Sequence, residues 1–233
     1  SKKVAILQSN YIPWKGYFDM IAAVDEFILY DDAQFTKNDW RNRNKIKTAQ
    51  GIQWLSVPVG QDISRRIRDV ELPDTNWNIK HWKSIENNYR KAKYFEEVSL
   101  FFKPIYMKHY ANLSELNRVL IEAVCNYLGI KTKISNSWNF NLADGKINRL
   151  LELCSQANAT EYVSGPAAMS YIEPLLFKEK GVKLTWFDYS GYPEYQQLFG
   201  EFAHGVTILD LLFNCGKSSS NYMKYGMKVQ HDL

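Results

Sequence analysis

The first thirty residues alternate between short apolar runs and polar turns. Residues 3–8 and 27–30 carry the continuous apolar runs of buried strands, and residues 18–24 between them have the spacing of an amphipathic helix. A turn containing Pro13 and Gly16 separates the first strand from this helix. A strand, a helix and a second strand in this order predict a parallel pair joined by a right-handed crossover.

The pattern becomes mainly helical in the middle of the chain. Two short runs predict strands, at residues 46–47 and 54–59. Three stretches then carry apolar positions at helical spacing, at residues 78–91, 95–110 and 114–128. Ser114 is the expected N-cap of the third helix, Gly129 its expected stop, and Pro104 an expected kink or break. No flexible linker flanks these helices, so we interpret residues 76–130 as a helical insertion in a single domain of residues 1–233.

The alternation of strands and helices returns after the insertion. Further strands are predicted at residues 131–134, 161–163 and 182–187. Further helices are predicted at residues 146–158, 167–178 and 207–213. Together these elements predict an α/β fold, with an open and mostly parallel sheet flanked by helices and interrupted by the helical insertion.

Composition and charge restrict the class of protein more than its activity. The chain has 233 residues, of which 45% are hydrophobic and 23% charged, as expected for a globular domain. The net charge of +4 suits an anionic small ligand, and without a dense Lys/Arg block we expect no nucleic-acid partner. The chain begins directly with a predicted strand and has no apolar run as long as a membrane span, so we expect a cytoplasmic protein.

Cysteine and aromatic content give two further indications. Cys125, Cys154 and Cys215 are far apart and form no CxxC pair, which favours neither a disulfide framework nor a thiolate metal site. Aromatic residues make up 15% of the chain. Their rings could stack on a base or a sugar, and they could equally fill a bulky core.

The first candidate site follows the first predicted strand. In open α/β sheets ligands bind at the carboxyl ends of strands, where a helix N-terminus offers free N–H groups to an anion. A glycine at this turn would let the backbone approach a phosphate closely. The alternative is a plain turn with an aromatic staple. The candidate substrate-binding residues of this block are Gln8, Asn10, Tyr11, Trp14, Lys15, Gly16 and Tyr17.

The second candidate block follows the second predicted strand. Asp31 and Asp32 are paired carboxylates, which could hold a metal, act as a general base, or bind an amine or sugar hydroxyls. They could also serve only loop solubility and a helix cap. We take Asp31, Asp32 and Lys37 as candidate catalytic residues and Gln34 as a candidate binding residue.

The third candidate block is basic and aromatic. Arg41 and Arg43 could grip a phosphate or carboxylate in a bidentate manner, Trp40 could stack, and Asn42 could bind hydroxyls, although a solvated basic loop is the alternative.

Two later loops add to the candidates. Ser164 and Gly165, in a tight loop after a predicted strand, are candidate binding residues. Residues 216–220, which include Lys217 and three serines, could cover a phosphate or form a helix cap and a frayed tail.

These blocks resemble a known family. Residues 8–18, 31–37 and 40–44 resemble the opening blocks of the WbqC-like proteins, and residues 162–165 and 208–216 resemble later blocks. Ser9 departs from the proline that is usual in the family. The resemblance covers nearly the whole chain. It implies that the protein is the product of a surface-polysaccharide gene cluster and modifies a sugar nucleotide.

A more distant resemblance links the chain to adenylate-forming enzymes of the nucleotidylyltransferase superfamily. It rests on the turn at residues 13–17, the second strand and the loop at residues 216–220. Trp14 and Tyr17 stand where those enzymes carry histidines. This resemblance implies ATP as a candidate cofactor, with Lys217 closing over pyrophosphate.

Taken together, these features lead to one leading hypothesis and two alternatives. The leading hypothesis is N-acyl or aminoacyl transfer to an amino-sugar nucleotide in surface-polysaccharide (O-antigen-type lipopolysaccharide) biosynthesis, with no metal assigned. Asp31 or Asp32 would accept the amine proton. The alternatives are a non-catalytic protein that binds a nucleotide or sugar nucleotide, and a metal-dependent glycosyltransferase in which the two aspartates hold the metal.

Overall fold

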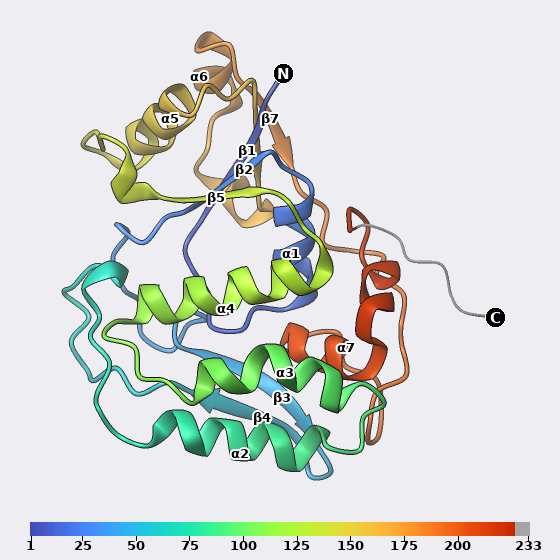
Figure 1. Ribbon diagram of the computed structural model, residues 1–233. Helices are drawn as coiled ribbons and strands as arrows, with labels where there is room; N and C mark the ends of the chain where they lie inside the picture. The colour runs from blue at the N-terminus through green and yellow to red at the C-terminus, as the bar shows by residue number, and fades with distance from the viewer. Residues whose placement is uncertain (227–233) are drawn as a thin grey trace.

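A five-stranded parallel sheet forms the centre of the computed structural model, which describes residues 1–226 (Figure 1). The strands lie in the order β5–β2–β1–β6–β7, and each neighbouring pair is parallel. Their bounds are β1 Lys3–Leu7, β2 Glu26–Leu29, β5 Lys133–Asn136, β6 Glu161–Ser164 and β7 Lys183–Trp186. The predicted α/β fold with an open, mostly parallel sheet is thereby confirmed.

The two faces of the sheet are covered by different helices because successive side chains of a strand point to opposite sides. Val4, Ile6 and Ile28 pack in one core with residues of α5 and α6, whereas Ala5 and Phe27 pack in another core with residues of α1 and α4. The bounds of these helices are α1 Lys15–Ala22, α4 Leu113–Leu128, α5 Lys146–Gln156 and α6 Pro174–Glu179. The apolar runs predicted as buried strands are therefore buried on both faces.

The strand order reverses between β1 and β6. From β1 the chain passes through α1 to β2 on one side, and from β5 it passes through α5 back to β6 on the other side of β1. Connections that leave in opposite directions open a crevice at the carboxyl ends of these two strands. The fold thus places its natural ligand site after Leu7 and after Ser164.

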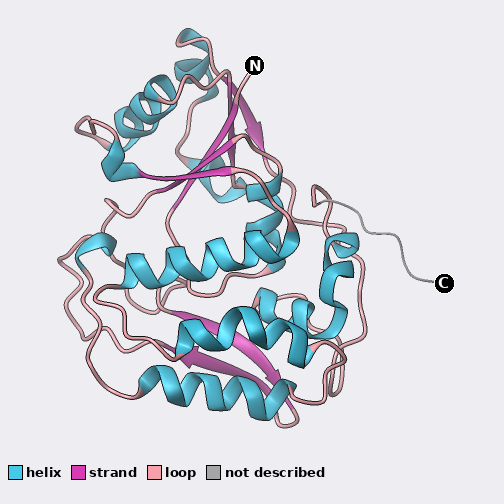
Figure 2. Ribbon diagram, viewed as in Figure 1, coloured by secondary structure: helices cyan, strands magenta, loops and turns pink. Residues whose placement is uncertain are grey.

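A second layer lies below the sheet in the view of Figure 1, beyond α4. It contains an antiparallel hairpin and three helices, namely β3 Arg43–Thr48, β4 Gly51–Ser56, α2 Trp77–Tyr89, α3 Phe95–Tyr106 and α7 Ile208–Cys215 (Figure 2). Short 3₁₀ helices span Ile67–Asp69, Ser137–Asn139, Pro166–Ser170 and Gly216–Tyr222. One hydrophobic core continues from the sheet through α1 and α4 into this layer.

The ends of the helices between residues 76 and 130 differ in part from the prediction. The N-cap of α4 is Asn112, whose side chain accepts a hydrogen bond from the Glu115 N–H, whereas the Ser114 hydroxyl donates to a buried carboxylate instead. Gly129 ends the helix as predicted, with a φ of 71°. Helix α3 continues through Pro104 to its last residues, where proline removes a single backbone hydrogen bond near the helix end.

Two later segments also differ from the prediction. The helix predicted from residue 167 begins only at Pro174, after a 3₁₀ turn. The frayed tail considered after residue 218 is instead a 3₁₀ helix in which Ser219 and Ser220 are buried. Among residues 1–226, no helix combines the length and the apolar character needed to cross a membrane.

A buried chain of hydrogen bonds crosses the second layer. The Tyr106 hydroxyl lies 2.5 Å from the Tyr11 hydroxyl, which lies 2.7 Å from Nδ1 of His81. On its other side, Nε2 of His81 donates to the Ser56 carbonyl at 3.0 Å. Tyr11, a predicted binding residue, is therefore fully buried in the core rather than open to a ligand.

We expect His81 to make the free energy of unfolding depend on pH. Burial lowers the pKa of His81 to about 4, below the usual 6.5, so the unfolded chain binds the proton more readily. The histidine therefore makes its full contribution to the free energy of unfolding above about pH 6.5. That free energy falls by about 3 kcal/mol in all as the pH drops from 6.5 through 4. Urea unfolding across this range measures the loss. His81→Gln should remove that part of the pH dependence, whereas His109→Gln, at a more exposed site, should leave it unchanged.

Candidate functional site

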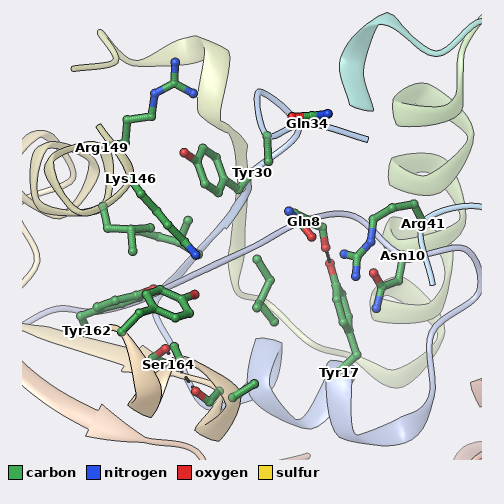
Figure 3. A pocket seen from close by; sticks show the side chains of 18 of the residues that line it. Gln8, Asn10, Tyr17, Tyr30, Gln34, Arg41, Lys146, Arg149, Tyr162 and Ser164 are labelled. Carbon is green, nitrogen blue, oxygen red and sulfur yellow. Dashed lines mark hydrogen bonds between the residues drawn. The ribbon is translucent and has the colours of Figure 1, made fainter. Parts of the chain in front are cut away.

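A cavity of about 890 Å³ opens at the carboxyl ends of β1 and β6 (Figure 3). Its wall comes from the end of β1, the turn into α1, the loop after β2, the start of α5 and the loop after β6. This is the crevice that the strand order creates. The polar and aromatic lining residues are Gln8, Asn10, Trp14, Tyr17, Tyr30, Gln34, Arg41, Lys146, Arg149, Tyr162, Ser164, Tyr171 and Tyr189.

The cavity lining carries three cations and no acidic residue, although Arg41 pairs with Asp39 from outside the lining. Arg41, Lys146 and Arg149 line the cavity, and its lining contains no Asp, Glu, His or Cys. Figure 3 shows Lys146 reaching toward the middle of the cavity, while the guanidinium of Arg149 lies farther from the middle. Nε of Arg149 donates to the Ala143 carbonyl at 3.0 Å. Helix α5 begins at this wall, and its N-cap is Gly145, which offers no side chain to occupy the first N–H groups. An anion at this end would meet two cations and a helix N-terminus.

Aromatic rings form much of the remaining wall. Trp14 lies against Tyr189 with ring centres 5.6 Å apart, and the ammonium of Lys146 lies 3.7 Å from the centre of the Tyr171 ring. Tyr30 and Tyr162 extend the wall on the side of the cavity near α5 (Figure 3). Flat rings of this kind can stack on a base or on the apolar face of a sugar.

The opposite end of the cavity is polar and only partly satisfied. Gln8, Asn10 and Arg41 lie together there (Figure 3). Oδ1 of Asn10 and Nε of Arg41 are both buried without a hydrogen-bond partner, although Arg41 also makes a long ion pair with Asp39, at 3.5 Å. One atom is an acceptor and the other a donor. Both atoms are enclosed by protein, so the groups that face a ligand at this end are the other donors and acceptors of Gln8, Asn10 and Arg41, which suit sugar hydroxyls.

The turn between β1 and α1 is held in an unusual conformation. Ile12 is fully buried and has a positive φ of 35°, which is strained for a β-branched residue. Two residues later, the indole of Trp14 lies over Gly16 so closely that a Cβ there would overlap the ring. Gly16 is therefore needed to make room for Trp14, and the turn aims that indole into the cavity wall.

Gly16→Ala is expected to displace the Trp14 indole. Overpacking of this kind lowers the free energy of unfolding by about 1–3 kcal/mol, partly offset by the better helix propensity of alanine. We also expect weaker binding of a cavity ligand, because the indole is part of the wall. Urea unfolding and calorimetric titration measure the two effects. Gly205→Ala is the matched control, since a Cβ at Gly205 would meet nothing within 4 Å. If the two variants have equal stability and equal ligand affinity, the role assigned to Gly16 in holding the Trp14 indole is wrong.

The structure brings eight of the predicted site residues into the cavity wall. They are Gln8, Asn10, Trp14, Tyr17, Gln34, Arg41, Ser164 and Gly165. The side chain of Tyr17 is largely buried, and its hydroxyl donates to the Gln8 carbonyl at 2.9 Å. The remaining predicted residues lie elsewhere.

Asp31 is buried among donors beside the first strand. Its Oδ1 accepts from the Ser9 N–H at 2.8 Å, and its Oδ2 accepts from the hydroxyls of Ser9 and Ser114 at 2.7 and 2.6 Å. Burial raises the pKa of Asp31, while these donors oppose the rise. Asp31 thus ties the end of β2 to the end of β1 and to α4, and it is not among the residues lining the cavity.

Asp32 holds a different pair of loops. It accepts from the Ser137 hydroxyl at 2.7 Å and forms ion pairs with Arg66 and Arg68 at 3.3 and 3.0 Å. It therefore joins the loop after β5 to the segment before α2. Lys37, the third predicted catalytic residue, is exposed and outside the cavity wall.

The side chain of Lys15 is not part of the cavity wall and lies instead among three aromatic rings. Its ammonium hydrogen-bonds with Nδ1 of His204 and lies 5.3–5.5 Å from the ring centres of Tyr192, Tyr195 and Phe202. Burial lowers the pKa of Lys15 to about 8. This contact fastens the long loop before α7 to the start of α1.

The basic and aromatic block divides between two places. Arg41 lines the cavity, whereas Trp40 and Arg43 lie on the exposed side of the hairpin. The Asn42 side chain donates to the Val57 carbonyl at 2.9 Å and supports the hairpin. Lys217 lies in another region of the fold, where its ammonium donates to the Tyr127 carbonyl at 2.8 Å.

Several lining residues were missed by sequence reasoning. Tyr30 and Tyr162 each lie within or beside a recognised block, so the alternation along their strands could have indicated them. Lys146 and Arg149 carried a weaker signal, namely their position at the start of a helix that follows a strand. Only the pairing of β6 with β1 brings α5 to this crevice.

Neither acidic or histidine side chains nor cysteine thiols gather in the cavity wall. Among residues 1–226, no three His, Cys, Asp or Glu side chains are grouped so as to hold a metal ion. Burial raises the pKa of Cys125, Cys154 and Cys215 to about 12, which keeps each thiol protonated near neutral pH. None of the three lines the cavity.

Comparison with known proteins agrees with the resemblance read from the blocks. Residues 8–222 match the WbqC-like protein family. The chain is also similar to the uncharacterized protein Rv1507c of Mycobacterium tuberculosis, with 55% identity over 227 residues that cover 96% of this chain and 98% of that protein. No solved structure matches. The chain belongs to the WbqC-like protein family.

Proposed function

We propose that the protein binds a sugar nucleotide in the cavity between β1 and β6. The observation that carries this proposal is a lining with three cationic side chains and no acidic one, at the reversal point of a parallel sheet. An anionic ligand complements this charge. Aromatic rings on the same wall favour a ligand that also has a flat base.

The parts of a sugar nucleotide correspond to the parts of the cavity. Its phosphates would lie at the N-terminus of α5, beside Lys146 and Arg149. The base would stack among the tyrosines near α5. The sugar hydroxyls would bond with the polar side chains of Gln8, Asn10 and Arg41 at the opposite end.

The reaction that we propose forms an amide between the amine of the sugar and an acyl or aminoacyl group. The bond between that group and its donor breaks, and coenzyme A or AMP leaves. Membership of the WbqC-like family is consistent with a role in polysaccharide biosynthesis. The cations of the cavity would stabilise negative charge on the attacked carbonyl. Neither Asp31 nor Asp32 lines the cavity, so the amine proton would leave through a lining Tyr or Lys, or through water. ATP, as an activating cofactor, would bind at this cationic end before the sugar nucleotide does, because both ligands carry phosphates to it.

Binding without turnover is the second candidate function. The cavity lining contains no carboxylate, imidazole or thiol, which are common general bases and nucleophiles. This observation favours a protein that holds a sugar nucleotide for another enzyme.

Native mass spectrometry and calorimetry test these proposals. The purified protein is searched for a copurified sugar nucleotide and titrated with UDP-N-acetylglucosamine as a probe. UDP-glucosamine is then incubated with acyl-coenzyme A, or with ATP and amino acids, and loss of the free amine is measured. Binding with amide formation supports the enzyme, and binding without it supports the carrier. If no sugar nucleotide of a varied panel binds, the proposed ligand class is wrong.

A further inference from the structure

The outer face of the β3–β4 hairpin combines exposed indole rings with cations. Trp40 and Trp54 are 39% and 43% exposed, with ring centres 5.5 Å apart. The guanidinium of Arg43 lies 3.9 Å from the centre of the Trp54 ring, and the ammonium of Lys45 lies 4.9 Å from it. Lys45 pairs across the hairpin with Trp54, so these side chains share one face. We call these four residues the aromatic–basic face; none of them lines the cavity.

The charge of this face is not balanced within the hairpin. Residues 43–56 contain three cations and no Asp or Glu. Lys47 is buried, where its ammonium donates to the Gln197 side chain at 3.0 Å. Lys45 and Arg43 therefore provide the charge of the face, and Nη2 of Arg43 also donates to the Asn38 carbonyl at 2.8 Å. Asp39, which precedes the hairpin in the chain, is paired with Arg41. A partner of this face is therefore expected to be negatively charged.

The size and chemistry of the face distinguish between anionic partners. Single-stranded nucleic acid usually needs a basic groove that follows several nucleotides, and this face offers two cations beside one pair of rings. Ile52 is the one large aliphatic side chain exposed among residues 43–56, so the face offers little apolar surface for insertion into a membrane. Two neighbouring indoles match the apolar face of a sugar ring, and the cations beside them match its acidic group.

We propose that the aromatic–basic face binds a short anionic saccharide, with a sugar ring on the two indoles and its carboxylate or phosphate held by the two cations. This second site does not depend on the ligand of the cavity. The aromatic–basic face nevertheless adjoins the cavity along the chain, because Trp40 immediately precedes the lining residue Arg41. The Trp40 carbonyl also accepts from the Tyr11 N–H at 3.0 Å, which fixes this loop against the turn after β1.

Galacturonate oligomers test the proposal on the full chain. Their binding is followed by tryptophan fluorescence and compared with that of neutral galactose oligomers of the same length. We expect the charged oligomer to bind at least about tenfold more tightly, with a preference that weakens in high salt. The Trp40→Ala/Trp54→Ala and Arg43→Gln/Lys45→Gln variants, followed by calorimetry, should each lose about tenfold or more in affinity. Lys178→Gln/Lys180→Gln, which removes the same charge from exposed sites on and beside α6, should bind normally.

The outcomes that would overturn the proposal are separate from those of the cavity. Absence of galacturonate binding, or binding that the indole variants leave unchanged, would remove it. Tighter binding of uridine oligomers or of phosphatidylglycerol vesicles would assign the face to nucleic acid or to a membrane instead. Trp54→Phe retains a ring and serves if the double alanine variant does not fold. Titration with UDP-N-acetylglucosamine on the same variants reports on the cavity, where we expect no change.

Discussion

Replacing Lys146 and Arg149 together by glutamate is expected to weaken binding of UDP-N-acetylglucosamine by about 3–5 kcal/mol, or more than about a hundredfold. Each cation would donate a charge-assisted hydrogen bond to a phosphate, and each glutamate would add repulsion beside the N-terminus of α5. Isothermal titration calorimetry measures the loss.

The matched control for this reversal is Lys178→Glu with Lys180→Glu. These exposed lysines lie at the end of α6 and directly after it, outside the cavity wall, and their replacement changes the net charge of the protein by the same amount. If both double variants lose affinity equally, the effect comes from the overall charge and the cavity assignment fails. Thermal melting of each variant shows whether the fold is retained.

Asp31→Ala is expected to lower the free energy of unfolding by about 3–5 kcal/mol. The carboxylate is 1% exposed and accepts hydrogen bonds from one backbone N–H and two hydroxyls. Alanine would leave these buried donors unpaired where β1, β2 and α4 meet. Asp31→Asn keeps one acceptor oxygen and should destabilise the fold less. Urea unfolding of both variants measures the difference.

This prediction separates a structural role of Asp31 from a catalytic one. A catalytic carboxylate could be replaced by asparagine with loss of turnover and little loss of stability. Glu179→Ala, at an exposed carboxylate on α6, provides the control and should unfold like the unmodified protein. An Asp31→Ala variant of unchanged stability would contradict the role assigned here and return Asp31 to the catalytic candidates.

Much of the fold could be predicted because its signals are local. The runs at β1 and β2 are apolar without interruption, since both faces of a central parallel strand are buried. Gln8, Asn10 and Trp14 of the polar turn after β1 line the cavity, because a crevice at a strand end follows from the order of elements. A helix boundary differs from the prediction where two residues could serve as the cap. At the start of α4, Ser114 bonds to Asp31, so Asn112 is the N-cap instead.

Features of the site that depend on distant pairing could not be read from the chain. The sequence by itself determined which loops carry polar and aromatic side chains at the ends of the strands. Only the tertiary structure decided that Lys146 joins Arg41 across the crevice, because that depends on β6 pairing with β1. It also buried Asp31 among donors and turned Lys15 toward His204. The physical reason is that sequence spacing fixes the position of a side chain along its element, whereas its neighbours come from packing between elements far apart in the chain.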